Sequence, residues 1–207
     1  MSVVVAIKQD DKVFIGADSQ VTKGGTRSTL QNPNNYKIWK VKGVDNCIMG
    51  HVGVVRDANI VRLIDNMVTK YEEYKNEVDY EFVVKKVVPT IFDELKMYGY
   101  MKPDKYIEGI DSKFIFAYKD QLYAIFNDGC VVEVDDCIAI GSGSCEAIGS
   151  LLSTDCQQPR ERIIKAIKTS AACDIYVDYP IILTDTQDTK FDIITEKNEN
   201  EFLAKVE

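Results

Sequence analysis

Short apolar runs bounded by turn residues recur along the chain and are typical of β-strands. The dipeptide Asp128-Gly129 gives the clearest hairpin signal, because it readily forms the tight turn between paired strands. Residues 21–35 are polar and rich in Gly, Asn and Thr, which predicts a loop or short extended structure. The predicted strands cover residues 3–7, 12–17, 36–41, 45–51, 113–118, 121–127, 130–134, 137–140, 176–184 and 190–195.

Apolar residues at helical spacing predict two pairs of helices. The first pair covers residues 54–75 and 79–98, and Pro89 should kink or interrupt its second member because proline lacks a backbone N–H. The second pair covers residues 146–154 and 160–173, and Pro159 stands at the start of its last helix. The charged tail from Glu196 is expected to end on the surface.

The order of these elements is strands, two helices, strands, two helices, strands. This order predicts an α+β fold, a four-layer αββα sandwich in which two antiparallel sheets pack together and a helix pair covers each outer face. The chain shows neither a linker nor an internal repeat, so residues 1–207 are expected to form one domain.

The charge balance narrows the classes of partner. The net charge is −8, which argues against nucleic-acid binding because that function needs a basic face. No run approaches the roughly 18 apolar residues of a membrane helix. Lys8 and Asp10 interrupt the first apolar stretch too early for a signal peptide. The chain is therefore expected in the cytoplasm and away from membranes.

Metal-ligating residues are sparse. The chain has six cysteines but no C-x-x-C pair, and His51 is its single histidine. A metal site is therefore not expected, nor is a cofactor, and the thiols should be free in a reducing compartment.

Ser2 is the first candidate for chemistry. Aminopeptidase removes methionine before small residues, so removal of Met1 would leave Ser2 as the N-terminal residue. Its α-amine would then have a pKa of about 8 and could accept the proton of the adjacent hydroxyl. Nucleophile and base would lie on one residue. The plain alternative is an ordinary processed terminus.

Three further features accompany Ser2. Asp18 ends an apolar strand, where it is either a site carboxylate or a strand cap. Strand alternation places Lys37 on the same face as Trp39 and Val41, so Lys37 is either inward and paired or a solvated edge lysine. The turn Gly141-Ser142-Gly143 either presents backbone donors and a hydroxyl to a site or has only a structural role.

Taken together, these features resemble the proteasome-like threonine peptidases, a branch of the N-terminal nucleophile hydrolases. The segment Gly16-Ala17-Asp18-Ser19-Gln20-Val21-Thr22 matches the family motif that follows the nucleophile and its first two strands. The resemblance covers nearly the whole chain and is nearest to the bacterial HslV type and related homologues. It implies catalytic roles for Ser2, Asp18, Lys37, Gly53, Ser142 and Asp174, and substrate contacts for Val21, Thr22, His51 and Val55.

This sequence departs from the family pattern at four places. Serine stands where threonine is usual, and it lacks the methyl group that restricts χ1. The loop 23–36 is longer than expected. Asp174 is followed by Ile175 and not by a Ser-Gly pair, which favours the HslV type. Val54 replaces a small residue and implies a narrower cleft.

The resemblance implies a peptidase subunit that acts on peptides or unfolded proteins. It also implies a homo-oligomeric ring, with an ATP-dependent unfoldase as a further partner. Two alternatives stay open. One is a non-catalytic ring subunit, and the other is a small-molecule amidase of the same fold.

Overall fold

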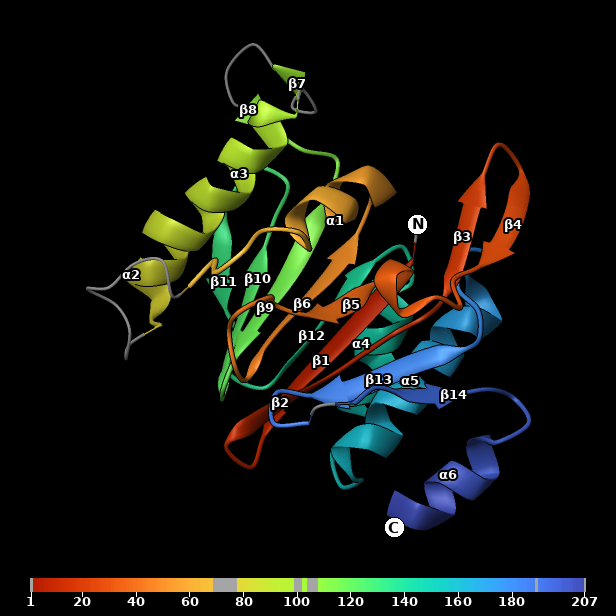
Figure 1. Cartoon of the computed structure of the whole chain (residues 1–207). Coiled ribbons are helices and arrows are strands. Elements are labelled where there is room, and N and C mark those ends of the chain that lie inside the picture. The colour runs from red at the N-terminus through yellow and green to blue at the C-terminus, as the bar shows by residue number, and fades with distance from the viewer. Residues whose placement is uncertain (1, 69–77, 99–101, 104–107, 189, 207) are drawn as a thin grey trace.

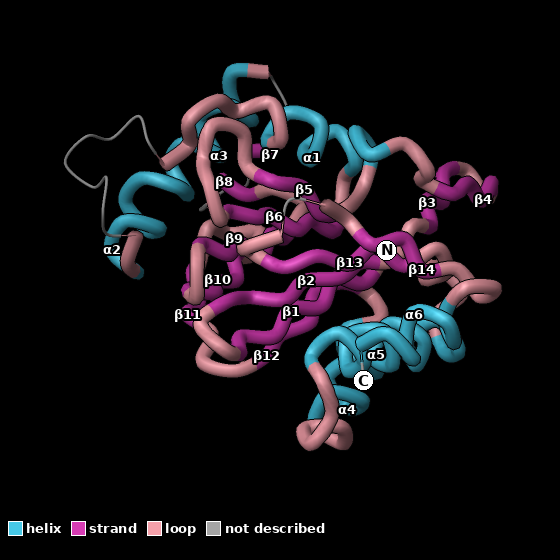
Figure 2. The backbone as a smooth tube through the Cα atoms, turned by 60° about the horizontal axis from the view of Figure 1, so that its bottom comes forward, coloured by secondary structure: helices cyan, strands magenta, loops and turns pink. Residues whose placement is uncertain are grey.

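Two five-stranded antiparallel sheets stack face to face in the computed structural model (Figure 1). The structure describes residues 2–68, 78–98, 102–103, 108–188 and 190–206. Each sheet carries helices on its outer face, as the tube in Figure 2 shows. The four-layer αββα sandwich predicted from the order of elements is therefore confirmed.

The first sheet is built around the N-terminal hairpin. Its strand order is β12-β1-β2-β13-β14, with antiparallel neighbours throughout. Val3 pairs with Gly141, and Val4 pairs with Ala17. The start of β1 therefore lies between the ends of β12 and β2. The strands are β1 (Val3–Gln9), β2 (Lys12–Ala17), β12 (Cys137–Gly141), β13 (Ile181–Asp185) and β14 (Asp192–Ile194).

The second sheet has the order β11-β10-β9-β6-β5. Its strands are β5 (Ile38–Lys40), β6 (Cys47–Val52), β9 (Lys113–Tyr118), β10 (Gln121–Ile125) and β11 (Val131–Glu133). Two small hairpins stand apart from it: β3 (Gln20–Lys23) with β4 (Thr26–Thr29), and β7 (Lys102–Pro103) with β8 (Glu108–Gly109).

Alternation along the strands builds the central layer between the sheets. Val4 and Ile15 from the first sheet and Ile48 and Ile115 from the second belong to one buried cluster. Their neighbours in sequence point outward to the helices, so Val5 joins the cluster on the other side of its sheet. The period of two residues thus supplies three apolar layers from two sheets.

Helices cover both outer faces. The second sheet is covered by α1 (Val55–Val61), α2 (Tyr80–Phe82), a π-helical turn (Val83–Val87) and α3 (Val88–Met97). The first sheet is covered by α4 (Ser144–Leu152) and α5 (Pro159–Cys173), and α6 (Glu199–Val206) packs beside α5. Among the described residues, none of these helices has the length and apolarity needed to cross a bilayer.

Two predicted helices differ from the structure. The helix expected over residues 54–75 ends at Val61, and turns follow up to residue 68. Residues 69–75 lie outside the described part of the chain. In the second helix, Pro89 is preceded by the π-helical turn, so the expected interruption takes the form of a local change in hydrogen bonding.

The C-terminal tail is more ordered than its composition predicts, whereas the segment 21–35 contains the short extended structure expected of it. The charged tail forms α6, because Phe202 and Leu203 pack against the apolar cluster on α5. The polar segment forms the β3–β4 hairpin and a short 3-10 helix (Pro33–Asn35).

The contact between the two sheets gives a stability prediction. A Cβ on Gly50 would lie 2.7 Å from Val4 Cγ1 and 3.1 Å from Ile15 Cδ1. Gly50→Val should therefore lower the free energy of unfolding by about 1–3 kcal/mol through overpacking. Urea denaturation measures the change.

Gly149 provides the matched control, because a Cβ there meets nothing within 4 Å. Gly149 lies inside α4. Gly149→Ala should be neutral or raise the free energy of unfolding by about 0.5–1 kcal/mol. Equal destabilisation by both substitutions would contradict tight packing between the sheets at Gly50.

Candidate active site

Ser2 lies directly before β1 and is held by the turn that follows β12. Its backbone N–H donates to Ser142 Oγ at 3.0 Å, and the Gly143 N–H donates to the Ser2 carbonyl at 3.4 Å. Gly141 has φ +111°, and a Cβ there would lie 2.1 Å from the Ser2 carbonyl oxygen. Only glycine permits this approach, so the turn closes around Ser2.

A buried ion pair stands beside Ser2. Lys37 Nζ lies 2.7 Å from Asp18 Oδ1, and the side chains are 6% and 0% exposed. The Asp18 carboxylate also accepts from the Val3 N–H at 2.9 Å and the Gln20 N–H at 3.0 Å. Burial lowers the pKa of the Lys37 ammonium, and the charge of Asp18 opposes that shift.

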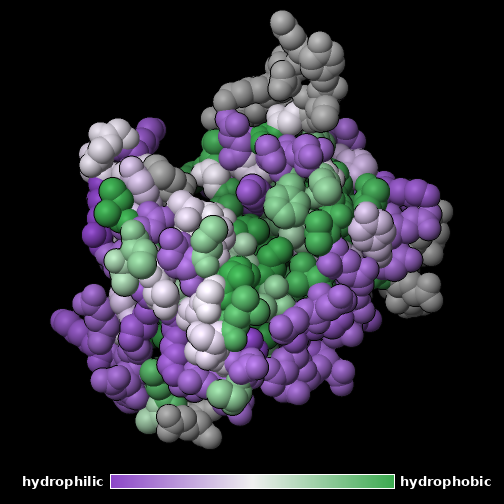
Figure 3. Space-filling model, turned by 180° about the vertical axis from the view of Figure 1, so that it is seen from behind, coloured by the Kyte–Doolittle hydropathy of each residue, from purple (hydrophilic) through white to green (hydrophobic). Residues whose placement is uncertain are grey.

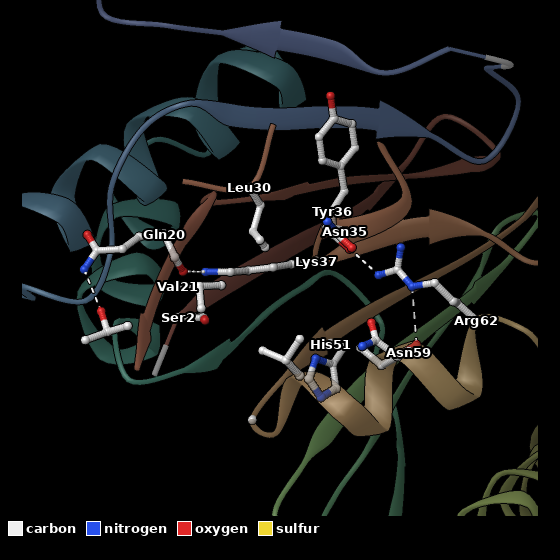
Figure 4. A pocket seen from close by; sticks show the side chains of 14 residues that line it. Ser2, Gln20, Val21, Leu30, Asn35, Tyr36, Lys37, His51, Asn59 and Arg62 are labelled. Atoms are coloured by element: carbon white, nitrogen blue, oxygen red, sulfur yellow. Dashed lines mark hydrogen bonds between the residues drawn. The ribbon is translucent and has the colours of Figure 1, made fainter. Parts of the chain in front are cut away.

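The ammonium of Lys37 has a donor to spare. It donates to Asp18 and to the Gln20 carbonyl at 2.6 Å, which accounts for two of the three N–H groups of a lysine. Figure 4 shows the end of Lys37 next to the Ser2 side chain. The arrangement places a positive charge and a hydrogen-bond donor beside the Ser2 hydroxyl.

Gly53 occupies a loop that only glycine can form. Its φ is +124°, and a Cβ would lie 2.3 Å from the Asp111 carbonyl oxygen and 2.7 Å from Ser112 Cα. No described residue accepts a hydrogen bond from the Gly53 N–H. Gly53 and Ser2 line the same cleft, so this amide is available to a bound group.

A chain of buried polar side chains supports the Gly53 loop. Ser112 Oγ donates to Asp57 Oδ2 at 2.6 Å and accepts from the Val54 N–H at 3.1 Å. His51 Nε2 lies 3.0 Å from the same hydroxyl. Burial lowers the pKa of His51 to about 3, so the imidazole is neutral at pH 7.

Asp174, the last predicted catalytic residue, does not line the cleft. It ends α5, and its Oδ1 accepts from the Tyr176 N–H at 2.9 Å. Its Oδ2 is buried and has no hydrogen-bond partner among the described residues. The negative charge of Asp174 favours protonated Lys37. The Ser2 amide donates to Ser142 and not to Asp174.

The cleft gathers most of the residues predicted from the sequence. Ser2, Lys37 and Gly53 line it, together with all four predicted substrate contacts: Val21, Thr22, His51 and Val55. Asp18, Ser142 and Asp174 are not among its lining residues, although Asp18 contacts Lys37 and Ser142 contacts Ser2. Its other lining residues are Gln20, Leu30, Asn35, Tyr36, Ala58, Asn59 and Arg62 (Figure 4).

Sequence reasoning missed several of these positions. Asn59 and Arg62 lie in and just after α1, and their place at the cleft depends on how α1 packs on the second sheet. Ser112 and Asp57 meet across 55 positions of sequence. Isolated polar residues at that separation carry no periodic signal.

The described part of the chain offers no metal-binding cluster. No group of three or more His, Cys, Asp or Glu side chains there is arranged to hold an ion. The chemistry of the cleft therefore has to be argued from its hydroxyl, ammonium, carboxylate and amide groups.

Comparison with known proteins identifies relatives of this chain. The family model described as "Proteasome subunit" matches residues 2–174. The ATP-dependent protease subunit HslV of Caldicellulosiruptor saccharolyticus is 28% identical over 179 residues, which cover 84% of this chain and 92% of that protein.

Solved structures share the fold at low identity. Thiobacillus denitrificans BPH superposes with a TM-score of 0.68 at 17% identity, covering 94% of this chain and 99% of that one. Eukaryotic HslV from Trypanosoma brucei gives 0.63 at 17% identity, with 88% and 98% covered. Anbu from Yersinia bercovieri gives 0.68 at 12% identity, with 99% and 95% covered.

The ion pair gives a second prediction. Lys37→Met leaves the buried Asp18 without its counter-ion and should lower the free energy of unfolding by about 3–5 kcal/mol. Adding Asp18→Asn removes the stranded charge, so the double variant should be more stable than Lys37→Met alone. Urea denaturation of both variants measures the difference.

Lys85 is the control for this prediction, since its pair with Glu81 is exposed. Lys85→Met should change the free energy of unfolding by no more than about 1 kcal/mol. A double variant less stable than Lys37→Met would argue against an uncompensated charge at Asp18.

The single histidine gives a third prediction. Because the folded pKa of about 3 lies below the ordinary value of 6.5, the unfolded chain binds a proton first as pH falls. This contribution to stability is complete above pH 6.5 and is lost toward pH 3, at about 1.4 kcal/mol per pH unit. Urea denaturation at several pH values should show this slope, and His51→Gln should lack it.

NMR titration checks the same group directly. The His51 ring signals should not move between pH 8 and pH 5 in the folded protein, since its pKa is about 3. A midpoint near 6.5 would show that the imidazole is not buried as a neutral ring.

Proposed function

The chain belongs to the proteasome subunit family, and from that premise we propose that it is a peptidase subunit whose nucleophile is Ser2. The observation that carries the proposal is the placement of Ser2 beside the buried Lys37–Asp18 pair, with its nitrogen on Ser142. The HslV relative, named an ATP-dependent protease subunit, supports the reaction class. The unit that acts is the whole chain, as one domain.

Removal of Met1 is the first requirement of the mechanism. Met1 lies outside the described residues. Once it is removed, the Ser2 nitrogen becomes an α-amine, in the position from which the amide now donates to Ser142 Oγ. A neutral amine accepts the proton of the Ser2 hydroxyl as Oγ attacks the substrate carbonyl.

Lys37 activates this step through its charge. A fixed ammonium beside the hydroxyl favours the alkoxide and keeps the α-amine neutral. Asp18 holds the ammonium in place through the 2.7 Å contact. Asp174, with its buried unpartnered oxygen, lies where it supports the charge of Lys37.

Gly53 provides the oxyanion donor. The carbonyl oxygen becomes negative in the tetrahedral intermediate, and the Gly53 N–H, which no described residue occupies, donates to it. Loss of one such donor typically costs about 3 kcal/mol of transition-state stabilisation. The amine then returns the proton to the leaving nitrogen, and water hydrolyses the acyl-serine by the same route.

An extended substrate fits the edge of β3. This strand pairs with β4 alone in its two-stranded sheet, so its other edge can add a peptide strand. Val21 and Thr22 lie on β3 and line the same cleft as Val55 and His51. Peptides and unfolded segments are therefore the proposed substrate class.

Assembly completes the proposal. We infer a homo-oligomeric cytoplasmic ring that receives substrate from an ATP-driven unfoldase, in keeping with the name of the HslV relative. Figure 3 shows a band of apolar side chains on the back face, bordered by hydrophilic ones. Such a band is typical of a surface that contacts other subunits.

Ser2→Ala tests the nucleophile. Alanine is also small, so Met1 is still removed and the variant differs only in the hydroxyl. Hydrolysis of fluorogenic peptides should fall by about 10⁴-fold or more. Intact-mass measurement should show that both proteins begin at residue 2.

Covalent labelling separates the competing functions. A peptide epoxyketone should add its full mass to the native chain and none to Ser2→Ala. Cys145→Ser excludes reaction at the exposed thiol nearby. A ring that forms but takes no label would indicate a non-catalytic subunit. Cleavage of simple amides without cleavage of extended peptides would indicate an amidase.

A further inference from the structure

The end of the cleft away from Lys37 carries a cation that no carboxylate neutralises. Arg62 follows α1 and lines the cleft with Asn59 and Asn35 (Figure 4). Among the described residues, no Asp or Glu lies within salt-bridge distance of its guanidinium. Its hydrogen bonds go to backbone carbonyl groups.

Those carbonyl groups fix the position of the guanidinium. Nη2 donates to the Tyr36 carbonyl at 2.6 Å, Nε donates to the Ala58 carbonyl at 3.3 Å, and Nη1 donates to the Asn34 carbonyl. The guanidinium carbon also lies 4.8 Å from the centre of the Trp39 ring. Acceptors among the described residues occupy three of the five N–H donors of this arginine, which leaves two.

The charge persists at neutral pH. Burial lowers the pKa of Arg62 to about 10, which is still well above 7. Carbonyl oxygens accept hydrogen bonds but bring no full negative charge. Arg62 is therefore a positioned cation with two unused donors.

The rest of the cleft does not offset this charge. No Asp or Glu is among its described lining residues. Lys37 is neutralised by Asp18, and His51 is uncharged because its pKa is about 3. Asp174 and Asp57 lie outside this lining, the first acting on Lys37 and the second bonded to Ser112, so Arg62 is the charged group that the lining itself presents without a carboxylate partner among the described residues.

We propose that Arg62 makes this cleft selective for an acidic side chain next to the scissile bond, so that Asp or Glu is the preferred residue on the acyl side. The proposal rests on the function proposed above. A carboxylate in the cleft would pair with the guanidinium and take its two unused donors. A lysine or arginine side chain would meet a like charge, and a leucine would leave those donors unpaired.

The competing explanation gives Arg62 a structural role alone. Its stacking on Trp39 and its bonds to the segment before β5 tie α1 to the second sheet. Under that explanation, substrate charge would be irrelevant. The two explanations differ in one measurable quantity, the dependence of hydrolysis on the acyl-side residue.

The test uses three fluorogenic tetrapeptides that differ only in that residue, which is Glu, Leu or Arg. The mature protein should show kcat/KM at least 10-fold higher for Glu than for Arg, with Leu between them. Arg62→Gln should lower the Glu value at least 10-fold and leave the Leu value within about threefold. Equal or better hydrolysis of the Leu or Arg peptide by the native protein would overturn the proposal.

Matched variants separate charge in the cleft from charge elsewhere. Arg56→Gln makes the same change on α1, at an exposed position outside the cleft lining. It should keep the native preference. Asn59→Asp places a carboxylate three positions before Arg62 without removing the contacts of Arg62. It should abolish the Glu preference even if Arg62→Gln fails to fold, and retention of the preference would count against the proposal.

Binding to the Ser2→Ala variant makes the result independent of catalysis. Calorimetry with the uncleaved peptides should give the tightest Kd for Glu, and Asn59→Asp in the same background should remove that advantage. If the native protein hydrolyses none of the peptides but this order of affinity holds, the function proposed for Ser2 is wrong and the selectivity of the cleft stands. If all three bind alike, the selectivity is wrong.

Discussion

The buried pair of Asp18 and Lys37 is the interaction on which the arrangement of the site depends. A charge at this depth is tolerated only with a counter-ion and hydrogen bonds. Asp18 obtains them from Val3, Gln20 and Lys37. These groups come from the start of β1, the start of β3 and the segment before β5. Satisfying one carboxylate therefore brings three separate segments of the chain together beside Ser2.

The same pairing gives the cleft two different ends. At one end the ammonium of Lys37 is paired with Asp18 beside Ser2. At the other end Arg62 has carbonyl partners and keeps its charge. A neutral His51 stands between them. The proposed catalysis uses Lys37, which is already paired with a carboxylate, and the proposed selectivity uses Arg62, which has none among the described residues.

The fold could be predicted because its layers follow simple periods. The period of two in strands and the period near 3.6 in helices show from the sequence alone which side chains face the core. The first helix was predicted too long because apolar spacing continues past Val61. Ile64, Met67 and Val68 are buried in the core cluster beneath α1, but they reach it from turns, with Leu63 left 71% exposed. The helix α6 was missed because two apolar residues in a charged tail give almost no signal.

The site could be predicted only where neighbouring sequence supplies a motif. Asp18 lies in such a motif, whereas Ser112 and Arg62 do not. Ser112 receives the Val54 N–H and donates to Asp57, and so holds the loop in which Gly53 adopts its positive φ. The orientation of the proposed oxyanion donor then depends on a hydroxyl some sixty positions away. Preorganisation of this kind is a property of tertiary packing. Because this packing leaves the Gly53 amide without an acceptor among the described residues, the loop and the buried polar chain beneath it have to be understood as one unit.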